Sequence, residues 1–262
     1  MISVIIPTLN EEKLLPQCLG QFTAEIKQKF GIEIIVSDGG STDATVEIAT
    51  KYADKVLGKA DSSELIADSN NIPLSAISYQ LSASRQTIAE GRNLGAAKAE
   101  GDILVFLNAD TIIPNIESFF ELSTQHLALS TNLVALAVKV EVISSERKLS
   151  DTIFHAFFNR YVSLLNLVGI AMGRGECQIV RREAFKKVGG YNESLAAGED
   201  FEFYKRLSKF GKIRYDPKLL VYESPRRYRK YGYPKVYAQW VMNAFSILFT
   251  KKAASKAWEE VR

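Results

Sequence analysis

The sequence predicts an α/β fold in which helices cover a mostly parallel sheet. Short apolar runs that are typical of buried strands occur at residues 3–6, 32–36 and 103–107. Segments with apolar residues at helical spacing lie between these runs, from Asn10 to Ile26 and at residues 43–53. Strands and helices that alternate in this way build a parallel sheet with helices on its faces. The 262 residues suit one sizeable domain of this class.

The first half of the chain contains the clearest elements. Its first strand is expected to stop at Pro7, and Asn10 is expected to begin a helix. The apolar positions of that helix are Leu14, Leu15, Leu19, Phe22 and Ile26. A further helix, beginning near Gly91, precedes the strand at 103–107. The pattern weakens between residues 58 and 89, where we expect an insertion or long loop with a strand at 77–81.

The second half of the chain is less regular but still alternates. We expect strands at residues 133–143 and 176–180, and helices at residues 150–172, 183–187 and 201–210. Gly189 and Gly211 are expected to end the last two of these helices. An amphipathic helical stretch is expected from Pro234 onward.

Composition restricts the classes of function. The net charge is only +3, which does not favour binding to nucleic acid. Cys18 and Cys177 are far apart and fit neither a zinc site nor a disulfide framework, so we expect a reduced, cytoplasmic setting. We expect no signal peptide at the N-terminus and no apolar run of the ~18–20 residues that a spanning helix needs.

Polar residues follow the predicted strands at the edge of the sheet where ligands bind in such folds. Asn10 follows the first strand, Asp38 the second, and Asn108 and Asp110 the strand at 103–107. An Asn or Asp here has an ordinary explanation as a turn residue. The alternative is a site for a hard cation or a sugar at the carboxyl ends of the strands. Three such strand ends together favour a binding site.

Five segments in chain order carry a resemblance to a known family. They read VIIPTLNEE, VSDGGSTDAT, GRNLGAAKAEGDILVFLNADT, RREAFKKVGGYNE and GEDFEFYKRL. Together they resemble the family 2 inverting glycosyltransferases with the glycosyltransferase-A fold, a Rossmann-like, mixed and mostly parallel sheet flanked by helices. The resemblance implies a catalytic domain at residues 1–225, and we expect a basic, amphipathic helical appendage at residues 226–262. It also implies a nucleoside diphosphate-sugar donor and a divalent cation, Mg²⁺ or Mn²⁺.

The resemblance implies that one group of residues binds the donor. Pro7, Asn10 and Glu11 would border the nucleoside, although a strand stop and a helix cap explain them too. Asp38 would contact the base, with a turn carboxylate as the alternative. Gly91 and Arg92 would contact the nucleotide, where a solvated arginine at a helix start is the alternative.

The resemblance also places the metal. Asp110 matches the second aspartate of the family's Asp-x-Asp motif, and a cation there would offset the charge that develops on the diphosphate. The first position of the motif is Asn108, which brings no charge but can bond a ribose hydroxyl or a metal-bound water. A second carboxylate at Asn108 is therefore expected to tighten metal binding.

Glu199 and Asp200 match the family's Glu-Asp pair, whose aspartate is the general base. Inverting transfer is a single displacement, so one carboxylate must accept the proton of the attacking hydroxyl. Both residues also suit a helix N-terminus. Family members often carry a C-terminal histidine, and in that region this chain has Arg226 and Arg227. These arginines could bind the diphosphate or form a solvated basic patch.

We interpret the chain as a transferase of one sugar to an acceptor hydroxyl on a glycan or a lipid-linked molecule, in cell-envelope or exopolysaccharide assembly. A nucleotidyltransferase is a weaker alternative, because the acidic loop PTLNEEKLLP lacks the glycines of a phosphate loop. A nucleotide-sugar-binding protein without activity is the other alternative. The apolar segments at residues 161–172 and 236–249, with basic residues 226–230, suggest peripheral contact with the cytoplasmic face of the inner membrane. Core packing or a dimer interface is the alternative for these segments, and it is favoured for the first of them.

Overall fold

The computed structural model describes residues 1–58, 86–250, 252–255 and 261. The chain divides into two compact units, Met1–Asp110 and Thr111–Arg262. The predicted strand at residues 77–81 and most of the predicted insertion lie outside the described residues. The compact units divide after Asp110 and not at residue 225. The predicted functional division at residue 225, between a catalytic domain and an appendage, stays a prediction.

Among the described residues, four parallel strands form the sheet of the first unit, in the order β3-β2-β1-β4. They are β1 (Ile2–Thr8), β2 (Ile32–Asp38), β3 (Lys55–Gly58) and β4 (Ile103–Leu107). β1 and β2 are buried along almost their whole length, as strands covered on both faces are. Pro7 lies inside β1 and does not stop it. Thr8 is level with Asp38 across the β1–β2 pair, so the loops that follow these strands begin side by side.

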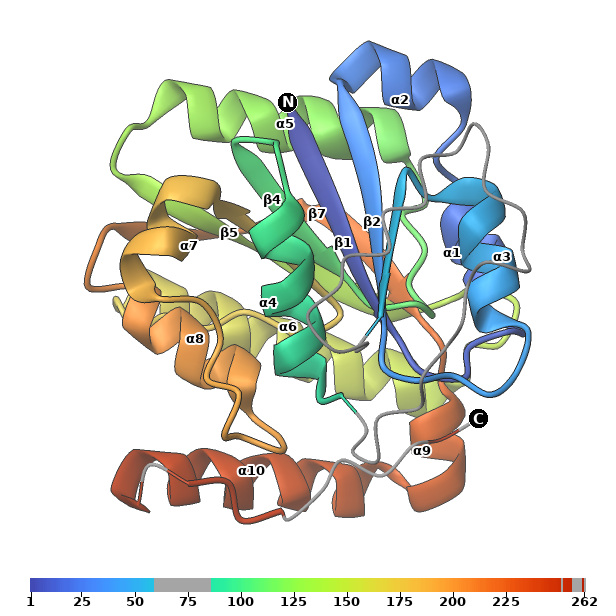
Figure 1. Cartoon of the computed structure of the whole chain (residues 1–262). Helices are drawn as coiled ribbons and strands as arrows, with labels where there is room; N and C mark the ends of the chain where they lie inside the picture. The colour runs from blue at the N-terminus through green and yellow to red at the C-terminus, as the bar shows by residue number, and fades with distance from the viewer. Residues whose placement is uncertain (59–85, 251, 256–260, 262) are drawn as a thin grey trace. The chain divides into compact units, whose positions relative to one another are not determined.

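In the part of the first unit that the structure describes, four helices accompany these strands: α1 (Leu15–Gly20), α2 (Ala24–Phe30), α3 (Thr45–Tyr52) and α4 (Ile88–Lys98). In Figure 1, α4 crosses in front of β1 and β2, with which it is in contact. The prediction of one helix starting at Asn10 is wrong, because two short helices occupy that stretch. Thr23 caps α2, its side chain accepting a hydrogen bond from the Ile26 N–H, and so starts a separate helix.

The described residues of the second unit include three strands in the order β6-β5-β7. They are β5 (Leu133–Val142), β6 (Cys177–Arg181) and β7 (Lys212–Glu223). β5 is antiparallel to β6 and parallel to β7, so the strands of the chain are mixed and mostly parallel, as predicted. β7 was not predicted as a strand. Pro217 interrupts its pattern, at a register shift between the pairs Val138–Asp216 and Lys139–Leu220.

Six helices complete the second unit as far as its residues are described. They are α5 (Ile116–Leu129), α6 (Leu149–Leu167), α7 (Arg182–Val188), α8 (Glu199–Leu207), α9 (Arg226–Tyr231) and α10 (Tyr233–Thr250). α5 and α6 each contact β5 and β7, and α10 contacts α8 and α9. α6 ends earlier than predicted because the side chain of Asn166 bonds the backbone N–H and C=O of Met172 and turns the chain. Within the described residues, every helix is too short or too polar to cross a membrane.

Candidate functional site

The loops after β1 and β2 are joined by the side chain of Asn10. Its Oδ1 accepts a hydrogen bond from the Thr42 N–H at 2.7 Å, and its backbone N–H donates to Ser41 Oγ at 2.7 Å. Asn10 has a φ of 53°, a left-handed conformation that asparagine tolerates better than most residues. Asn10 is therefore a loop residue and not the predicted helix start. Its predicted place beside the nucleoside stays a prediction.

Asp38 forms the centre of the β2 loop, with its carboxylate fully buried. One carboxylate oxygen accepts from the hydroxyl of Thr8 at 3.0 Å and of Ser41 at 2.5 Å. The other accepts from the backbone N–H of Gly40 at 3.0 Å and of Ser41 at 2.8 Å. The turn explanation therefore describes a real part of what Asp38 does. Its contact with the donor base stays a prediction.

Glu11 and the neighbouring acidic residues join the same two loops a second time. The Glu11 N–H donates to Thr45 Oγ1 at 2.7 Å, and Asp43 Oδ1 accepts from the Thr45 N–H at 3.0 Å. Burial raises the pKa of Asp43, but the hydrogen bonds from Thr45 outweigh it and the pKa is lowered. Asp43 thus stabilises the start of α3 as a charged carboxylate.

Gly91 lets α4 approach the end of β1. A Cβ on Gly91 would lie 3.2 Å from Cβ of Pro7, and one turn further along α4 a Cβ on Gly95 would lie 2.4 Å from Cγ2 of Ile5. Close helix–strand packing therefore requires Gly95, whereas a Cβ on Gly91 would need a shift of only a few tenths of an ångström. α4 begins at the capping box of Thr87 and Glu90, earlier than predicted from Gly91. The predicted nucleotide contact of Gly91 stays a prediction.

Arg92 and Asn108 contact each other inside the first unit. Arg92 is 1 % exposed, and its Nη2 donates to Asn108 Oδ1 at 3.1 Å. The alternative of a solvated arginine is therefore wrong. Asn108 and Asp110 follow β4 directly, and Asp110 is only partly buried. The two residues of the metal motif thus have different environments, because the amide oxygen of Asn108 is already a hydrogen-bond acceptor for an arginine.

The side chains at the end of β4 suit a divalent cation that a bound diphosphate also coordinates. Among the described residues, no group of three or more His, Cys, Asp and Glu side chains is placed to hold a metal. Asp110 is then the one carboxylate at this strand end. Mg²⁺ and Mn²⁺ sites that act on nucleotides take one or two carboxylates together with phosphate oxygens and water. The residues present fit a cation bound together with a diphosphate.

Glu199 and Asp200 begin α8 in the second unit. Gly198 precedes them with a φ of 78°, and a Cβ there would lie 2.7 Å from Cδ1 of Ile247 in α10. Glu199 is buried, whereas Asp200 is partly exposed and accepts a hydrogen bond from the Phe201 N–H at 2.8 Å. The position of the pair at the start of α8 agrees with the helix-start explanation, and the predicted roles of Asp200 as base and Glu199 as its neighbour stay predictions.

A buried ionic cluster in the second unit was not predicted. The Arg174 guanidinium bonds Glu176 at 2.8 Å, Glu223 at 2.9 Å and Nδ1 of His155 at 3.2 Å. Burial and the positive charge of Arg174 lower the pKa of His155 to about 3, so this imidazole is neutral. The signal in the sequence was the segment MGRGE, an arginine between two glycines after a long helix.

The basic residues 226–230 form helix α9, and they do not act as one surface. Arg229 bonds the buried carboxylate of Asp151 at 2.7 Å and 2.5 Å. Burial raises the pKa of Asp151, but its bonds with Arg229 and Tyr233 outweigh burial and lower it well below its usual range. Arg226 and Arg227 occupy the first turn of α9, and their predicted contact with the diphosphate stays a prediction.

Comparison with known proteins identifies a family. The family described as Glycosyl transferase family 2 matches residues 3–189. The chain is 28 % identical over 210 residues to the succinoglycan biosynthesis protein ExoA of Rhizobium meliloti. The matched region is 79 % of this chain and 58 % of that protein. It is also 28 % identical over 207 residues to a PGL/p-HBAD biosynthesis glycosyltransferase of Mycobacterium bovis, covering 78 % of this chain and 68 % of that protein.

Solved structures show the fold. The mannosyltransferase PcManGT of Pyrobaculum calidifontis, in complex with GDP-Man and Mn²⁺, has a TM-score of 0.66 at 17 % identity and covers 98 % of this chain and 65 % of its own. TarS 1-349 of S. aureus, in complex with UDP-GlcNAc, has a TM-score of 0.59 at 20 % identity and covers 86 % of this chain and 58 % of its own. The predicted glycosyltransferase-A fold is confirmed.

Proposed function

Because the chain belongs to glycosyl transferase family 2, we propose that it transfers a sugar from a nucleoside diphosphate-sugar to an acceptor hydroxyl, with inversion at the anomeric carbon. The observation that carries the proposal is the Glu199-Asp200 pair at the start of α8, held by a glycine that packs on α10. A single displacement needs one base and no covalent intermediate. Asp200 accepts the acceptor's proton, and Glu199 positions the loop or contacts the acceptor.

The first unit binds the donor in this proposal. The interlocked loops of Asn10, Glu11 and Asp38 border the base and ribose, beside Pro7. Arg92 fixes Asn108 through the bond between their side chains, and Asp110 holds Mg²⁺ or Mn²⁺ together with the diphosphate. The bound cation offsets the negative charge on the leaving diphosphate. PcManGT and glucosyl-3-phosphoglycerate synthase were solved with Mn²⁺, which supports a divalent cation here.

The similar proteins support a role in glycan assembly. By their names, the relatives from Rhizobium and Mycobacterium take part in succinoglycan and PGL/p-HBAD biosynthesis. We therefore propose a glycan or lipid-linked acceptor in cell-envelope or exopolysaccharide assembly. The donors in the solved structures carry guanine or uracil, as GDP-Man, UDP-GlcNAc and UDP-Glc, so donors with both bases belong in a screen.

Asp200→Asn tests the base. Sugar release from UDP-, GDP- and dTDP-sugars with Mn²⁺ would identify a donor, and calorimetry would give its affinity. We expect Asp200→Asn to lower turnover by about 10²–10⁴-fold, because general-base catalysis contributes that much, while donor affinity changes little. Asp102→Asn is the matched control, since this carboxylate is 82 % exposed in the first unit.

Each outcome decides between the candidate functions. Turnover of Asp200→Asn within a few-fold of the parent would show that another group is the base. A parent protein that binds a nucleotide-sugar but never releases or transfers its sugar would be a binding protein without transferase activity.

A further inference from the structure

Helix α6 exposes an apolar stripe along its whole length. The stripe consists of six residues that are each between 57 % and 83 % exposed: Leu149, Ile153, Phe157, Leu164 and Leu167 of α6, and Val168 at its C-cap. At 100° per residue they occupy about 100° of arc, one side of the helix, and the exposed Arg160 lies within the same arc. The opposite side is buried, through residues such as Phe158 and Val162. A helix that is apolar on both sides needs a partner on its outer side.

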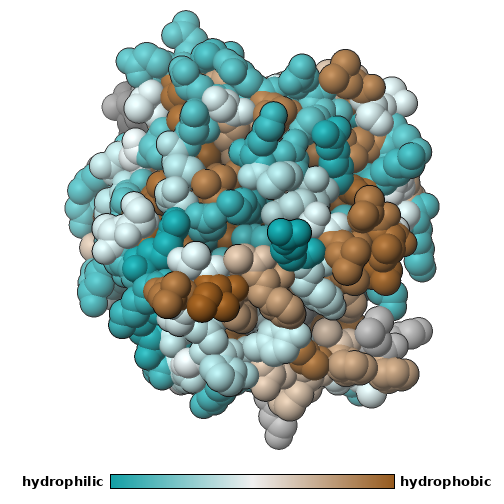
Figure 2. Space-filling view, turned by 180° about the vertical axis from the view of Figure 1, so that it is seen from behind, coloured by the Kyte–Doolittle hydropathy of each residue, from teal (hydrophilic) through white to brown (hydrophobic). Residues whose placement is uncertain are grey.

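α10 lies beside α6 and exposes apolar residues of its own. The Trp240 ring is 5.3 Å from the ring of Phe158 and 6.1 Å from the ring of Phe154, which joins the two helices. Met242, Phe245 and Phe249 are exposed along α10. Figure 2, which views the molecule from behind, shows apolar residues gathered in patches on the face seen there. The apolar surface is thus wider than one helix.

The charges on this surface are positive. Asp151 is the only carboxylate in the sequences of α6 and α10, and it is buried against Arg229 and Tyr233. Arg160 on α6 and Lys235 on α10 are both exposed. Two copies of this face would bring like charges together, whereas an anionic lipid surface attracts them at about 1 kcal/mol per cation. The charges therefore favour a lipid surface over a second copy of the chain.

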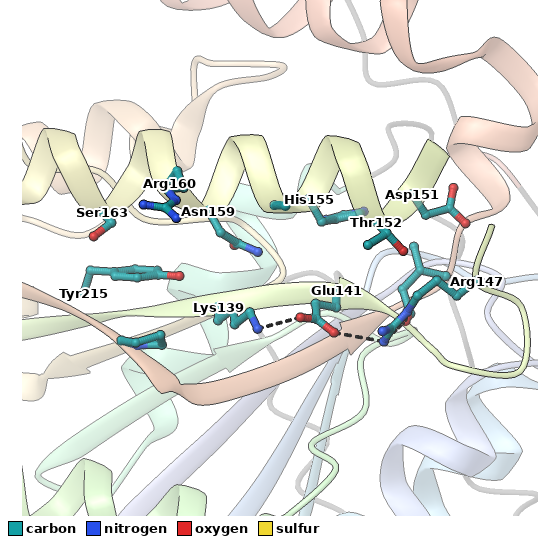
Figure 3. Close-up of a pocket in the computed structure, with 13 residues that line it drawn as sticks. Lys139, Glu141, Arg147, Asp151, Thr152, His155, Asn159, Arg160, Ser163 and Tyr215 are labelled. Atoms are coloured by element: carbon teal, nitrogen blue, oxygen red, sulfur yellow. Dashed lines mark hydrogen bonds and ion pairs between the residues drawn. The ribbon is translucent and has the colours of Figure 1, made fainter. Parts of the chain in front are cut away.

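A cavity of about 400 Å³ opens beside the stripe, between α6 and the strands β5 and β7. Figure 3 shows Arg160 and Ser163 reaching it from α6 and Tyr215 from β7, while the Glu141 carboxylate of β5, which also lines the cavity, is paired with Lys139 at 2.6 Å and with Arg147 at 2.9 Å. Within the described part of the chain, no hydrogen bond or ion pair satisfies the side chains of Arg160, Ser163 or Tyr215. Burial raises the pKa of Tyr215 to about 12, so its hydroxyl remains a donor at neutral pH. Three donors around one space suit a phosphate group.

We propose that the second unit docks on an anionic bilayer through α6, with the stripe in the acyl boundary and a lipid phosphate in the adjoining cavity. Helices of this kind lie in the plane of the interface, with their apolar side inserted just below the headgroups. The inference goes beyond the proposed function and does not depend on it, because no residue of the stripe or the cavity belongs to the proposed catalytic or donor-binding groups. The sequence-based prediction combined the apolar segments 161–172 and 236–249 with the basic residues 226–230, whereas this proposal centres the contact on the exposed side of α6.

Vesicle flotation tests the stripe. Ile153→Ser, Phe157→Ser and Leu164→Ser are combined in one variant, and binding is measured to phosphatidylcholine vesicles with and without phosphatidylglycerol. We expect the parent to bind vesicles that contain phosphatidylglycerol, and the variant to partition at least about tenfold less, because three exposed apolar side chains no longer insert. The control combines Leu129→Ser and Phe210→Ser, two exposed apolar residues outside α6 and α10, and should bind as the parent does.

Three outcomes would overturn this part of the proposal. In the first, the parent does not bind these vesicles. In the second, the triple variant binds as well as the parent. In the third, the parent is a dimer in solution and the triple variant is a monomer. The last outcome would assign the stripe to a second copy. Donor turnover, measured on the same samples, separates a failure of this proposal from a failure of the transferase function.

Arg160→Gln and Tyr215→Phe test the cavity. We expect their combination to weaken binding to vesicles with phosphatidylglycerol about tenfold, with exposed Lys209→Gln as the single-charge control. Inorganic phosphate should not displace the protein from vesicles. If the cavity variant and Lys209→Gln lose vesicle binding equally, the cavity contributes only a positive surface charge and no lipid site. If inorganic phosphate displaces the protein from vesicles, the cavity is a site for free phosphate.

Discussion

At the scale of single residues, the contact between Arg92 and Asn108 changes what the metal motif can do. The sequence alone predicts that a carboxylate at Asn108 tightens metal binding. In the structure the Asn108 oxygen accepts a hydrogen bond from a buried guanidinium. An aspartate there would form a charge-assisted bond with Arg92, which competes with a cation for the same oxygens.

Asn108→Asp and Asp110→Ala therefore have different expected effects. We expect Asp110→Ala to abolish the Mn²⁺-dependent part of donor affinity, because it removes the carboxylate at this strand end. We expect Asn108→Asp to leave Mn²⁺ affinity within a few-fold, because Arg92 holds the new carboxylate. Calorimetry with UDP and GDP over a Mn²⁺ series measures both. Mn²⁺ affinity about tenfold higher in Asn108→Asp would show that the ion, and not Arg92, takes the carboxylate.

At the scale of elements, α10 supports the start of α8. Gly198 has a positive φ, and its missing Cβ leaves space for Ile247. We expect Gly198→Ala to lower both stability and transferase turnover, because the left-handed strain of about 1–2 kcal/mol adds to a clash that moves the Glu199-Asp200 loop. Ile247→Val removes the clashing methyl group and should restore part of the turnover. Gly189→Ala, at a φ of 76° with open space around it, should cost only the strain.

Thermal melts and turnover of these variants distinguish strain from clash. A loss in Gly198→Ala no larger than that in Gly189→Ala would show that the contact with α10 does not position the loop. If adding Ile247→Val to Gly198→Ala restores no turnover, the loss comes from the backbone strain at residue 198 and not from a clash with Ile247.

The elements also show what could be predicted from the sequence. The strands β1, β2 and β4 follow from buried apolar runs, and the site residues follow from motifs within single segments. β7 could not be predicted, because Pro217 lies at a bulge whose register only the pairing with β5 defines. The bond between Arg92 and Asn108 joins two elements, and no spacing in the chain indicates it. The same holds for the exposed side of α6, since periodicity does not tell which apolar side of a helix is covered.

At the scale of the whole molecule, the buried charges make stability depend on pH. The folded pKa of His155 is lowered from 6.5 to about 3, by burial first and by Arg174 second. The unfolded chain therefore binds a proton near pH 6.5 that the folded chain does not bind. Stability from this group is fully present above pH 6.5 and falls as the pH is lowered towards 3. The carboxylates of Glu176 and Asp151, whose pKa values are lowered despite burial, act in the same direction but only below the usual carboxylate pKa of about 4.

The range between pH 6.5 and pH 5 thus isolates His155 from the carboxylates. We expect the free energy of unfolding to fall by up to about 1.4 kcal/mol per pH unit in this range from His155 alone. His155→Gln keeps an oxygen that can accept a hydrogen bond from Arg174, but its side chain does not titrate. Its free energy of unfolding should therefore fall less steeply with pH, by a difference that corresponds to at most one bound proton. Urea unfolding of both proteins at several pH values measures the slopes. Equal slopes would show that the His155 imidazole takes up a proton in the folded chain as readily as in the unfolded one, and that the charge of Arg174 does not hold it neutral.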